Sequence, residues 1–98
     1  MIKVYISKNK IVITGHAGYD EYGKDIVCAS ASSIVITSVN ACLRMDKDSL
    51  TYKEECDKLT IEVTSDNKNV LLILENMIQM LEELAETYKK NIKIIKED

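Results

Sequence analysis

A histidine, a cysteine and three glycines lie close together near the start of this 98-residue sequence. Gly15, Gly18 and Gly23 are the only glycines in the chain, and His16, its one histidine, lies among them. Cys28 follows shortly after. Glycines clustered in this way indicate a loop that is bent, mobile or closely approached by a ligand. The alternative is a flexible connector in which the histidine and the cysteine are incidental.

A cysteine is a nucleophile as its thiolate, which is favoured by the amides at a helix N-terminus and by a neighbouring imidazolium. Asp25 precedes an apolar run and is a favoured N-cap, so we predict a helix with Cys28 in its first turn. The loop could fold His16 over that turn, and free amides of the turn could hold the oxyanion of an attacked carbonyl. This combination predicts acyl transfer by a cysteine hydrolase, although most helical cysteines are small buried hydrophobes.

Further residues could support such a site. Any of Asp20, Glu21 and Asp25 could orient the imidazole as a third member, although helix capping is the favoured role for Asp25. Ser32 follows Cys28 by one helical turn on the same face. It would either approach the same pocket or serve as a small residue that lets the helix pack closely on the sheet.

The other two cysteines are not expected to take part. Cys42 lies about 21 Å from Cys28 along the same predicted helix, among apolar residues, and is interpreted as packing. Cys56 is expected to be exposed in a charged turn. Three cysteines and one histidine match the ligand count of a structural zinc site, but Cys28 and Cys42 are too far apart to share a metal. We therefore expect no metal and no cofactor, and a thiol redox sensor would lack a nearby resolving cysteine.

Hydrophobic periodicity predicts the elements that would position these residues. Alternating residues predict half-buried strands, and apolar residues at steps of three and four predict helices. The expected elements are strands at 2–7 and 11–14, a helix of about twenty residues after Asp25, a hairpin of strands at 50–55 and 59–64, a helix at 69–88 and a strand at 92–95. This order predicts a single α+β domain over residues 1–98, with two helices on a mostly antiparallel sheet.

Composition restricts the partners and the compartment. The chain has 13 basic and 16 acidic side chains, a formal net charge of −3, and five tyrosines as its only aromatic residues. We therefore expect no direct nucleic acid binding. The apolar run Ile26–Leu43 contains six serine, threonine and asparagine residues, so we expect a packed helix and no membrane contact. An odd number of cysteines and the absence of a signal-peptide pattern predict a cytoplasmic protein.

The stretch from Gly15-His16-Ala17-Gly18 through Asp25-Ile26-Val27-Cys28-Ala29-Ser30-Ala31-Ser32 resembles the ribosomal-processing cysteine protease (Prp) family. The match in length and element order extends over essentially the whole chain. The resemblance implies a cytoplasmic, homodimeric endopeptidase that removes the N-terminal extension of a bacterial large-subunit ribosomal protein, the twenty-seventh of its series, after apolar aromatic residues. It implies Cys28 as nucleophile and His16 as general base, with Gly15, Asp25 and Ser32 as further motif residues. It also implies a mobile loop between the histidine and the cysteine.

Two alternatives remain open at this point. The chain could be a non-catalytic ribosome-associated binding module that uses its sheet or the cluster Lys89, Lys90, Lys93 and Lys96. The second predicted helix carries more apolar residues than one core-facing stripe needs: Leu71, Leu72, Ile78 and Met80. These additional residues indicate burial on two sides, chance surface apolarity or a homodimer contact.

Overall fold

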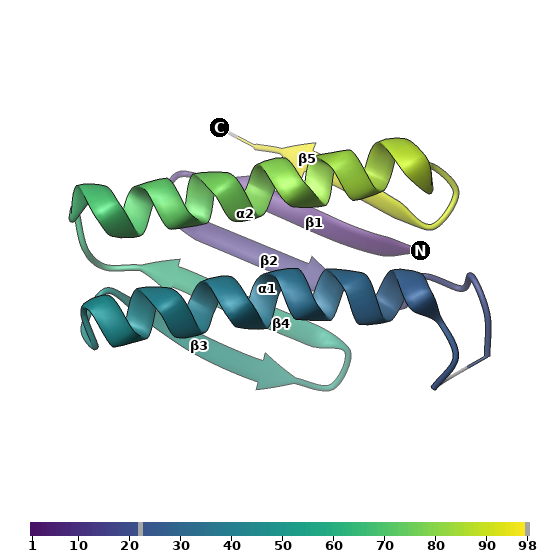
Figure 1. The fold of residues 1–98 in the computed structure, drawn as a ribbon, viewed down its shortest axis with the longest axis horizontal. Coiled ribbons are helices and arrows are strands. Elements are labelled where there is room, and N and C mark those ends of the chain that lie inside the picture. Colours follow the sequence, from purple (N-terminus) through teal and green to yellow (C-terminus); the bar gives the residue numbers. More distant parts are fainter. Residues whose placement is uncertain (22, 98) are drawn as a thin grey trace.

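Two helices cover one face of a five-stranded sheet in the computed structural model, which describes residues 1–21 and 23–97 (Figure 1). The elements are, in order, β1 (Ile2–Ser7), β2 (Lys10–Thr14), α1 (Ile26–Met45), β3 (Leu50–Glu55), β4 (Lys58–Val63), α2 (Lys68–Thr87) and β5 (Ile92–Lys96). The α+β class, the element order and the mostly antiparallel sheet predicted from periodicity are confirmed.

The strand order of the sheet is β3-β4-β2-β1-β5, and only the pairing of β1 with β5 is parallel. Thr14 at the end of β2 pairs with Lys58 at the start of β4. The Gly15 amide extends this ladder by donating to the carbonyl oxygen of Asp57 at 3.1 Å. The β3–β4 turn therefore lies beside the residues that directly follow β2, and this register places the turn next to His16.

The hydrophobic core lies between the sheet and the two helices. Ile2 and Val4 of β1 and Ile61 of β4 are buried, as their alternation with polar residues predicts. Each such side chain contributes about 1.5–3 kcal/mol when fully buried. The buried residues of α1 are Val27, Ala31, Val35, Val39 and Cys42, and those of α2 are Val70, Leu74, Met77 and Leu81. One stripe of each helix thus faces the core.

Among the described residues, α1 is the one helix long and apolar enough to cross a membrane by length and composition. Its buried residues recur at steps of three and four and pack into the core, which is the pattern of a helix in a folded domain. The prediction of a packed helix is therefore confirmed for this stripe. The other residues of the helix are half-buried or exposed, and Ile26 and Ile36 are among the exposed ones.

Candidate active site

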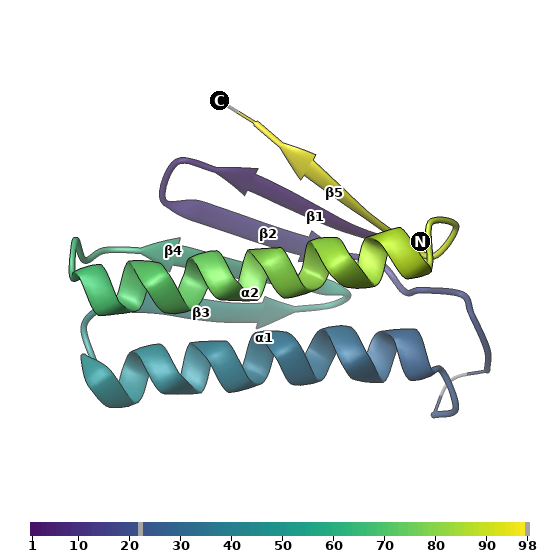
Figure 2. The ribbon, with the colours of Figure 1, turned by 45° about the horizontal axis from the view of Figure 1, so that its top comes forward.

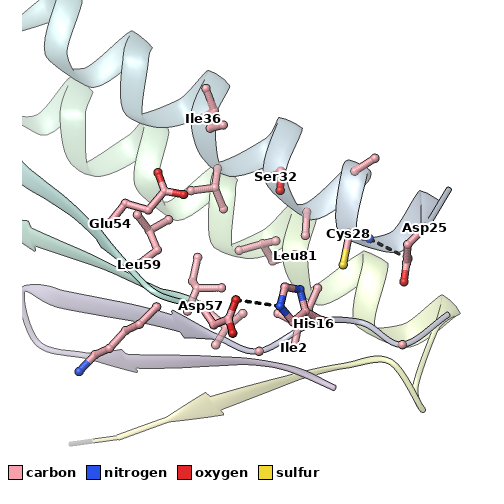
Figure 3. A pocket seen from close by; sticks show the side chains of 18 of the residues that line it. Ile2, His16, Asp25, Cys28, Ser32, Ile36, Glu54, Asp57, Leu59 and Leu81 are labelled. Atoms are coloured by element: carbon pink, nitrogen blue, oxygen red, sulfur yellow. Dashed lines mark hydrogen bonds and ion pairs between the residues drawn. The ribbon is translucent and has the colours of Figure 1, made fainter. Parts of the chain in front are cut away.

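A cavity of about 800 Å³ opens between α1, the segment after β2 and the β3–β4 hairpin. All five residues singled out by the sequence line it: Gly15, His16, Asp25, Cys28 and Ser32. Figure 3 shows the Cys28 sulfur and the His16 ring directed into this space from different elements, α1 and the segment after β2. The fold therefore brings the candidate nucleophile and the candidate base to one place.

The cavity has an apolar floor and an acidic rim. Its floor includes Ile2, Val4, Ile13, Val35, Leu59 and Leu81. Its acidic residues are Asp20, Asp25, Glu54, Glu55 and Asp57, and Lys58 is the lysine that lines it. Burial raises the pKa of Tyr52 on the same rim, and the negative charge of the Glu54 carboxylate, which accepts a hydrogen bond from the Tyr52 hydroxyl, raises that pKa further. The site therefore combines apolar binding surface with negative charge.

Asp25 is the N-cap of α1 and also ties down the preceding loop. Its Oδ1 accepts hydrogen bonds from the amides of Val27 and Cys28, both at 3.0 Å. Its Oδ2 accepts from the amides of Tyr19 at 2.9 Å and Asp20 at 3.3 Å. Burial alone would raise the pKa of the Asp25 carboxyl, but hydrogen bonds from these four amides outweigh burial and hold the pKa below its ordinary value of 3.8. The capping interpretation of Asp25 is confirmed.

This cap corrects one expectation about the oxyanion. The amides of Val27 and Cys28 are occupied by the Asp25 side chain, and the Ala29 amide donates to the Asp25 carbonyl oxygen at 3.0 Å. These three amides are therefore not free to hold an oxyanion in this structure. The expectation was wrong for them because a capping carboxylate satisfies the same donors that a developing negative charge would need.

The Cys28 thiol is half-buried, and its hydrogen-bond donor comes from the loop. Its Sγ accepts from the backbone amide of Ala17 at 3.2 Å. Ala17 is only 2% exposed, and its carbonyl oxygen accepts from Nδ2 of Asn91 at 3.0 Å. Ala17 is thus held on both sides, between α1 and the turn that precedes β5. Reasoning from the sequence missed Asn91, because nothing near position 91 marks it as a neighbour of the loop.

His16 is paired with an acid that the sequence did not suggest. Its Nε2 lies 2.8 Å from Oδ1 of Asp57, and both side chains are 60% exposed. Asp57 takes the place expected for Asp20, Glu21 or Asp25, because the antiparallel pairing of β2 with β4 carries the β3–β4 turn to His16 (Figure 3). Only knowledge of the strand order could have identified it. Within the described residues, the imidazole and the thiol are hydrogen-bonded to other partners and not to each other.

Gly15 and Ser32 have distinct structural settings. Gly15 has a φ of +84°, and a Cβ at this position would overlap the backbone carbonyl oxygen of Met1. Only glycine fits both constraints without distortion. Ser32 is exposed on the cavity wall one turn after Cys28. Its exposure rejects the alternative that it serves close packing of the helix on the sheet.

The other two cysteines have the surroundings predicted for them. Cys42 is completely buried, and burial raises the pKa of its thiol. Cys56 is exposed in the β3–β4 turn. In residues 1–21 and 23–97, no group of three or more histidine, cysteine and acidic side chains is arranged to hold a metal ion.

Comparison with known proteins identifies relatives along the whole chain. The model of the family described as "Cysteine protease Prp" matches residues 1–93. The ribosomal processing cysteine protease Prp of Staphylococcus aureus is 34% identical over 87 residues, which cover 86% of this chain and 82% of that protein. The protein of the same name from Mycoplasma genitalium is 34% identical over 97 residues, which cover 99% of this chain and 97% of that protein.

Solved structures show the same fold. A crystal structure of the essential ribosomal processing protease Prp from S. aureus, in complex with a covalently linked product peptide, has a TM-score of 0.93 at 31% identity. Its complex with a substrate peptide has a TM-score of 0.87 at 30% identity. Both matches cover 99% of this chain and 100% of the other.

The approach of Met1 to Gly15 predicts unequal effects of alanine at two glycines of the loop. Gly18 also has a positive φ, +67°, but open space where a Cβ would be. Gly18→Ala should cost about 1–2 kcal/mol from the backbone conformation alone. Gly15→Ala should cost about 1–3 kcal/mol more, because the Met1 backbone must also move. Urea unfolding of the two variants measures this difference, and equal losses would refute the steric role of Met1.

The cap predicts a pH-dependent stability at Asp25. Because folding lowers the pKa of this carboxyl below 3.8, its contribution is present above that pH and is lost as the pH falls through the lower folded value. Asp25→Asn should therefore lower the melting temperature at pH 7, since an amide has only one acceptor oxygen for four donors. The difference from wild type should shrink towards pH 2.5. Asp66→Asn is the control at an exposed acid, and a difference that stays constant with pH would contradict the cap.

Proposed function

Because this chain belongs to the Prp family of cysteine proteases, we propose that it removes the N-terminal extension of a bacterial large-subunit ribosomal protein, the twenty-seventh of its series. The chain is a cysteine endopeptidase, and the identity of its substrate is the proposed part. The observation that carries the proposal is that His16 and Cys28 line the same cavity. The S. aureus relative with this fold holds a covalently linked product peptide.

The shape and lining of the cavity support an extended peptide as substrate. The relative of known structure binds a substrate peptide on the same fold. In this chain the cavity runs between α1 and the β3–β4 hairpin, and its apolar floor suits an apolar side chain beside the scissile bond. Cys28 lies at one wall of this space, where a bound carbonyl carbon would be within its reach.

The proposed reaction uses Cys28 as nucleophile and His16 as general base. His16 takes the thiol proton, and the sulfur attacks the peptide carbonyl carbon to give a tetrahedral oxyanion. The carbon–nitrogen bond then breaks, and His16 returns its proton to the leaving amine. Water, deprotonated by His16, hydrolyses the thioester and releases the new carboxylate and the thiol. The enzyme is thereby regenerated, with no cofactor required.

The pairing of His16 with Asp57 decides which ring nitrogen can serve as the base. Nε2 lies against the Asp57 carboxylate, so Nδ1 is the nitrogen left for the thiol proton. The carboxylate also favours the imidazolium that forms during attack. Since the ring and the thiol have separate partners in the free chain, proton transfer requires the ring to turn towards Cys28 as substrate binds.

Membership of a protease family decides against the alternative of a non-catalytic binding module. The charges agree with this outcome. The cavity is rimmed by carboxylates, which repel a phosphate backbone. In the lysine cluster, Lys96 is paired with Glu82 at 3.6 Å.

We propose a cytoplasmic location as well, which is supported by three cysteines that are all unbonded thiols.

We propose that the chain forms a homodimer through the outer face of α1. This helix has no charged residue from Ile26 to Leu43, although Ile26, Ser33 and Asn40 on its outer face are exposed. Helix α2 has more exposed apolar residues, Leu71, Leu72 and Met80, but it also carries exposed acidic side chains: Glu75, Glu83 and Glu86. An uncharged face suits contact with a second copy, whereas two acidic faces would repel each other.

Substitution of each cysteine tests the assignment of the nucleophile. Cys28→Ala should abolish cleavage of a ribosomal protein that carries its extension, by about a thousandfold or more, with little change in the thermal melt. Cys56→Ser and Cys42→Ala, which alter thiols outside the cavity, should leave turnover intact in the folded protein. Mass spectrometry of the products measures the cut. Full activity of Cys28→Ala would reject the mechanism, and an uncut extension with wild-type enzyme would reject the substrate.

A charge on each helix tests the proposed dimer surface. Ser33→Glu should weaken dimerisation at least about tenfold, because the carboxylate would be buried without a partner. Leu72→Glu is the matched control on α2 and should leave the dimer intact. Size-exclusion chromatography with light scattering measures the mass. A monomeric wild-type protein at micromolar concentration, or dissociation by Leu72→Glu alone, would contradict the proposal.

A further inference from the structure

The Cys28 sulfur is directed into a cavity that is lined by several carboxylates (Figure 3). These carboxylates are Asp20 and Asp25 from the loop, and Glu54, Glu55 and Asp57 from the β3–β4 hairpin. The same cavity is also lined by His16, Lys58 and the neutral Tyr52. Glu55 is itself paired with Lys53 at 2.9 Å. The first amides of α1, the usual source of positive potential, are occupied by the Asp25 carboxylate.

The hydrogen-bond donor directed at the sulfur is the Ala17 amide, at 3.2 Å. A thiolate accepts such a bond more strongly than a neutral thiol does, because hydrogen bonds to a charged acceptor are stronger. A fixed amide at this distance therefore favours the deprotonated sulfur. The amide is useful only while its direction is fixed, and Ala17 belongs to a segment with glycines on both sides, Gly15 and Gly18.

Asn91 fixes the direction of this amide. Its Nδ2 donates to the Ala17 carbonyl oxygen at 3.0 Å. Its own backbone is held in the turn after α2, where its amide donates to the Tyr88 carbonyl at 2.9 Å and its carbonyl accepts from the Ile2 amide at 2.8 Å. The rings of Tyr88 and Tyr19 meet edge to face at 5.3 Å, which packs the loop against the same turn. Asn91 therefore couples a rigid part of the fold to the loop.

We propose that Asn91 is a positioning residue of the protease, which acts through the backbone of Ala17 to hold an amide donor on the Cys28 sulfur and so stabilises the thiolate when it forms. The inference rests on the proposed role of Cys28 as nucleophile. The amides at the start of α1 were expected to stabilise the thiolate. The inference assigns this role to the Ala17 amide, whose direction is set by Asn91, 63 positions beyond Cys28 in the sequence.

Alkylation of the thiol tests this role without any substrate. In a Cys56→Ser background, where Cys42 is buried, iodoacetamide reports on Cys28. Asn91→Ala should slow the reaction about tenfold at pH 7, the effect of losing one hydrogen bond to a charged group. The rates of parent and variant should converge at alkaline pH. A purely structural effect on access would slow the reaction equally at every pH.

Two further variants make the result decisive. Asn69→Ala, in the first turn of α2 and at the far end of that helix from Asn91, should alkylate like the parent (Figure 1). Asn91→Asp retains the size of the side chain but cannot donate to the Ala17 carbonyl at neutral pH, so it should react as slowly as Asn91→Ala. It serves in its place if the alanine variant does not fold.

The outcomes separate this proposal from the protease assignment. Alkylation of the folded Asn91 variants at the parental rate across the pH range would overturn the role of Asn91, while loss of cleavage in Cys28→Ala would still support the nucleophile. Retention of cleavage in Cys28→Ala would instead reject the nucleophile, whatever the alkylation rates. For Asn91→Ala we expect a reduced kcat/KM for the extended ribosomal protein that recovers at alkaline pH.

Discussion

The structure of the site depends on one carboxylate, Asp25, and on the four backbone amides that it binds. Two of these amides belong to the first turn of α1, and the other two belong to the loop at Tyr19 and Asp20. One side chain thus fixes where the helix begins and how the loop returns to it. It also occupies the amides of Val27 and Cys28, which are therefore not available to stabilise negative charge at the start of the helix. The contact that orders the site therefore leaves the reacting groups without these two helix amides as donors.

The sheet topology brings other residues to the site, and these residues bind His16 and Ala17. Residues 15–17 leave the end of β2 between two other parts of the chain, the β3–β4 turn on one side and the turn before β5 on the other (Figure 2). Asp57 binds the His16 ring from the first of these turns, and Asn91 binds the Ala17 carbonyl from the second. Both contacts follow from the positions of β4 and β1 as the two neighbours of β2, since β5 pairs with β1. The segment of the histidine is therefore fixed by residues remote in sequence.

This division between local and remote contacts explains what the sequence could predict. Strand alternation, helical periodicity and the Asp25 cap are local patterns, and they predicted all seven elements and their order. The concentration of glycines around His16, followed by Cys28, predicted a site formed by these two residues, and both line the cavity. Asp57 and Asn91 could not be predicted, because no local pattern states which strands are neighbours. The expectation of free oxyanion amides was wrong because the first-turn amides of a helix can bind either a capping side chain or an external anion. The sequence does not state which of the two they bind.

The acidic rim and the apolar floor together determine which charge state the site can hold when a peptide fills it. Exclusion of water lowers the local dielectric constant, which strengthens both the repulsion between a thiolate and the rim carboxylates and its attraction to His16 and the Ala17 amide. A lone thiolate would be disfavoured under these conditions. A thiolate beside an imidazolium is neutral as a pair, and the Asp57 carboxylate stabilises its positive member. The proton should therefore move from Cys28 to His16 within the closed site, and the ring must reach the sulfur before attack can begin.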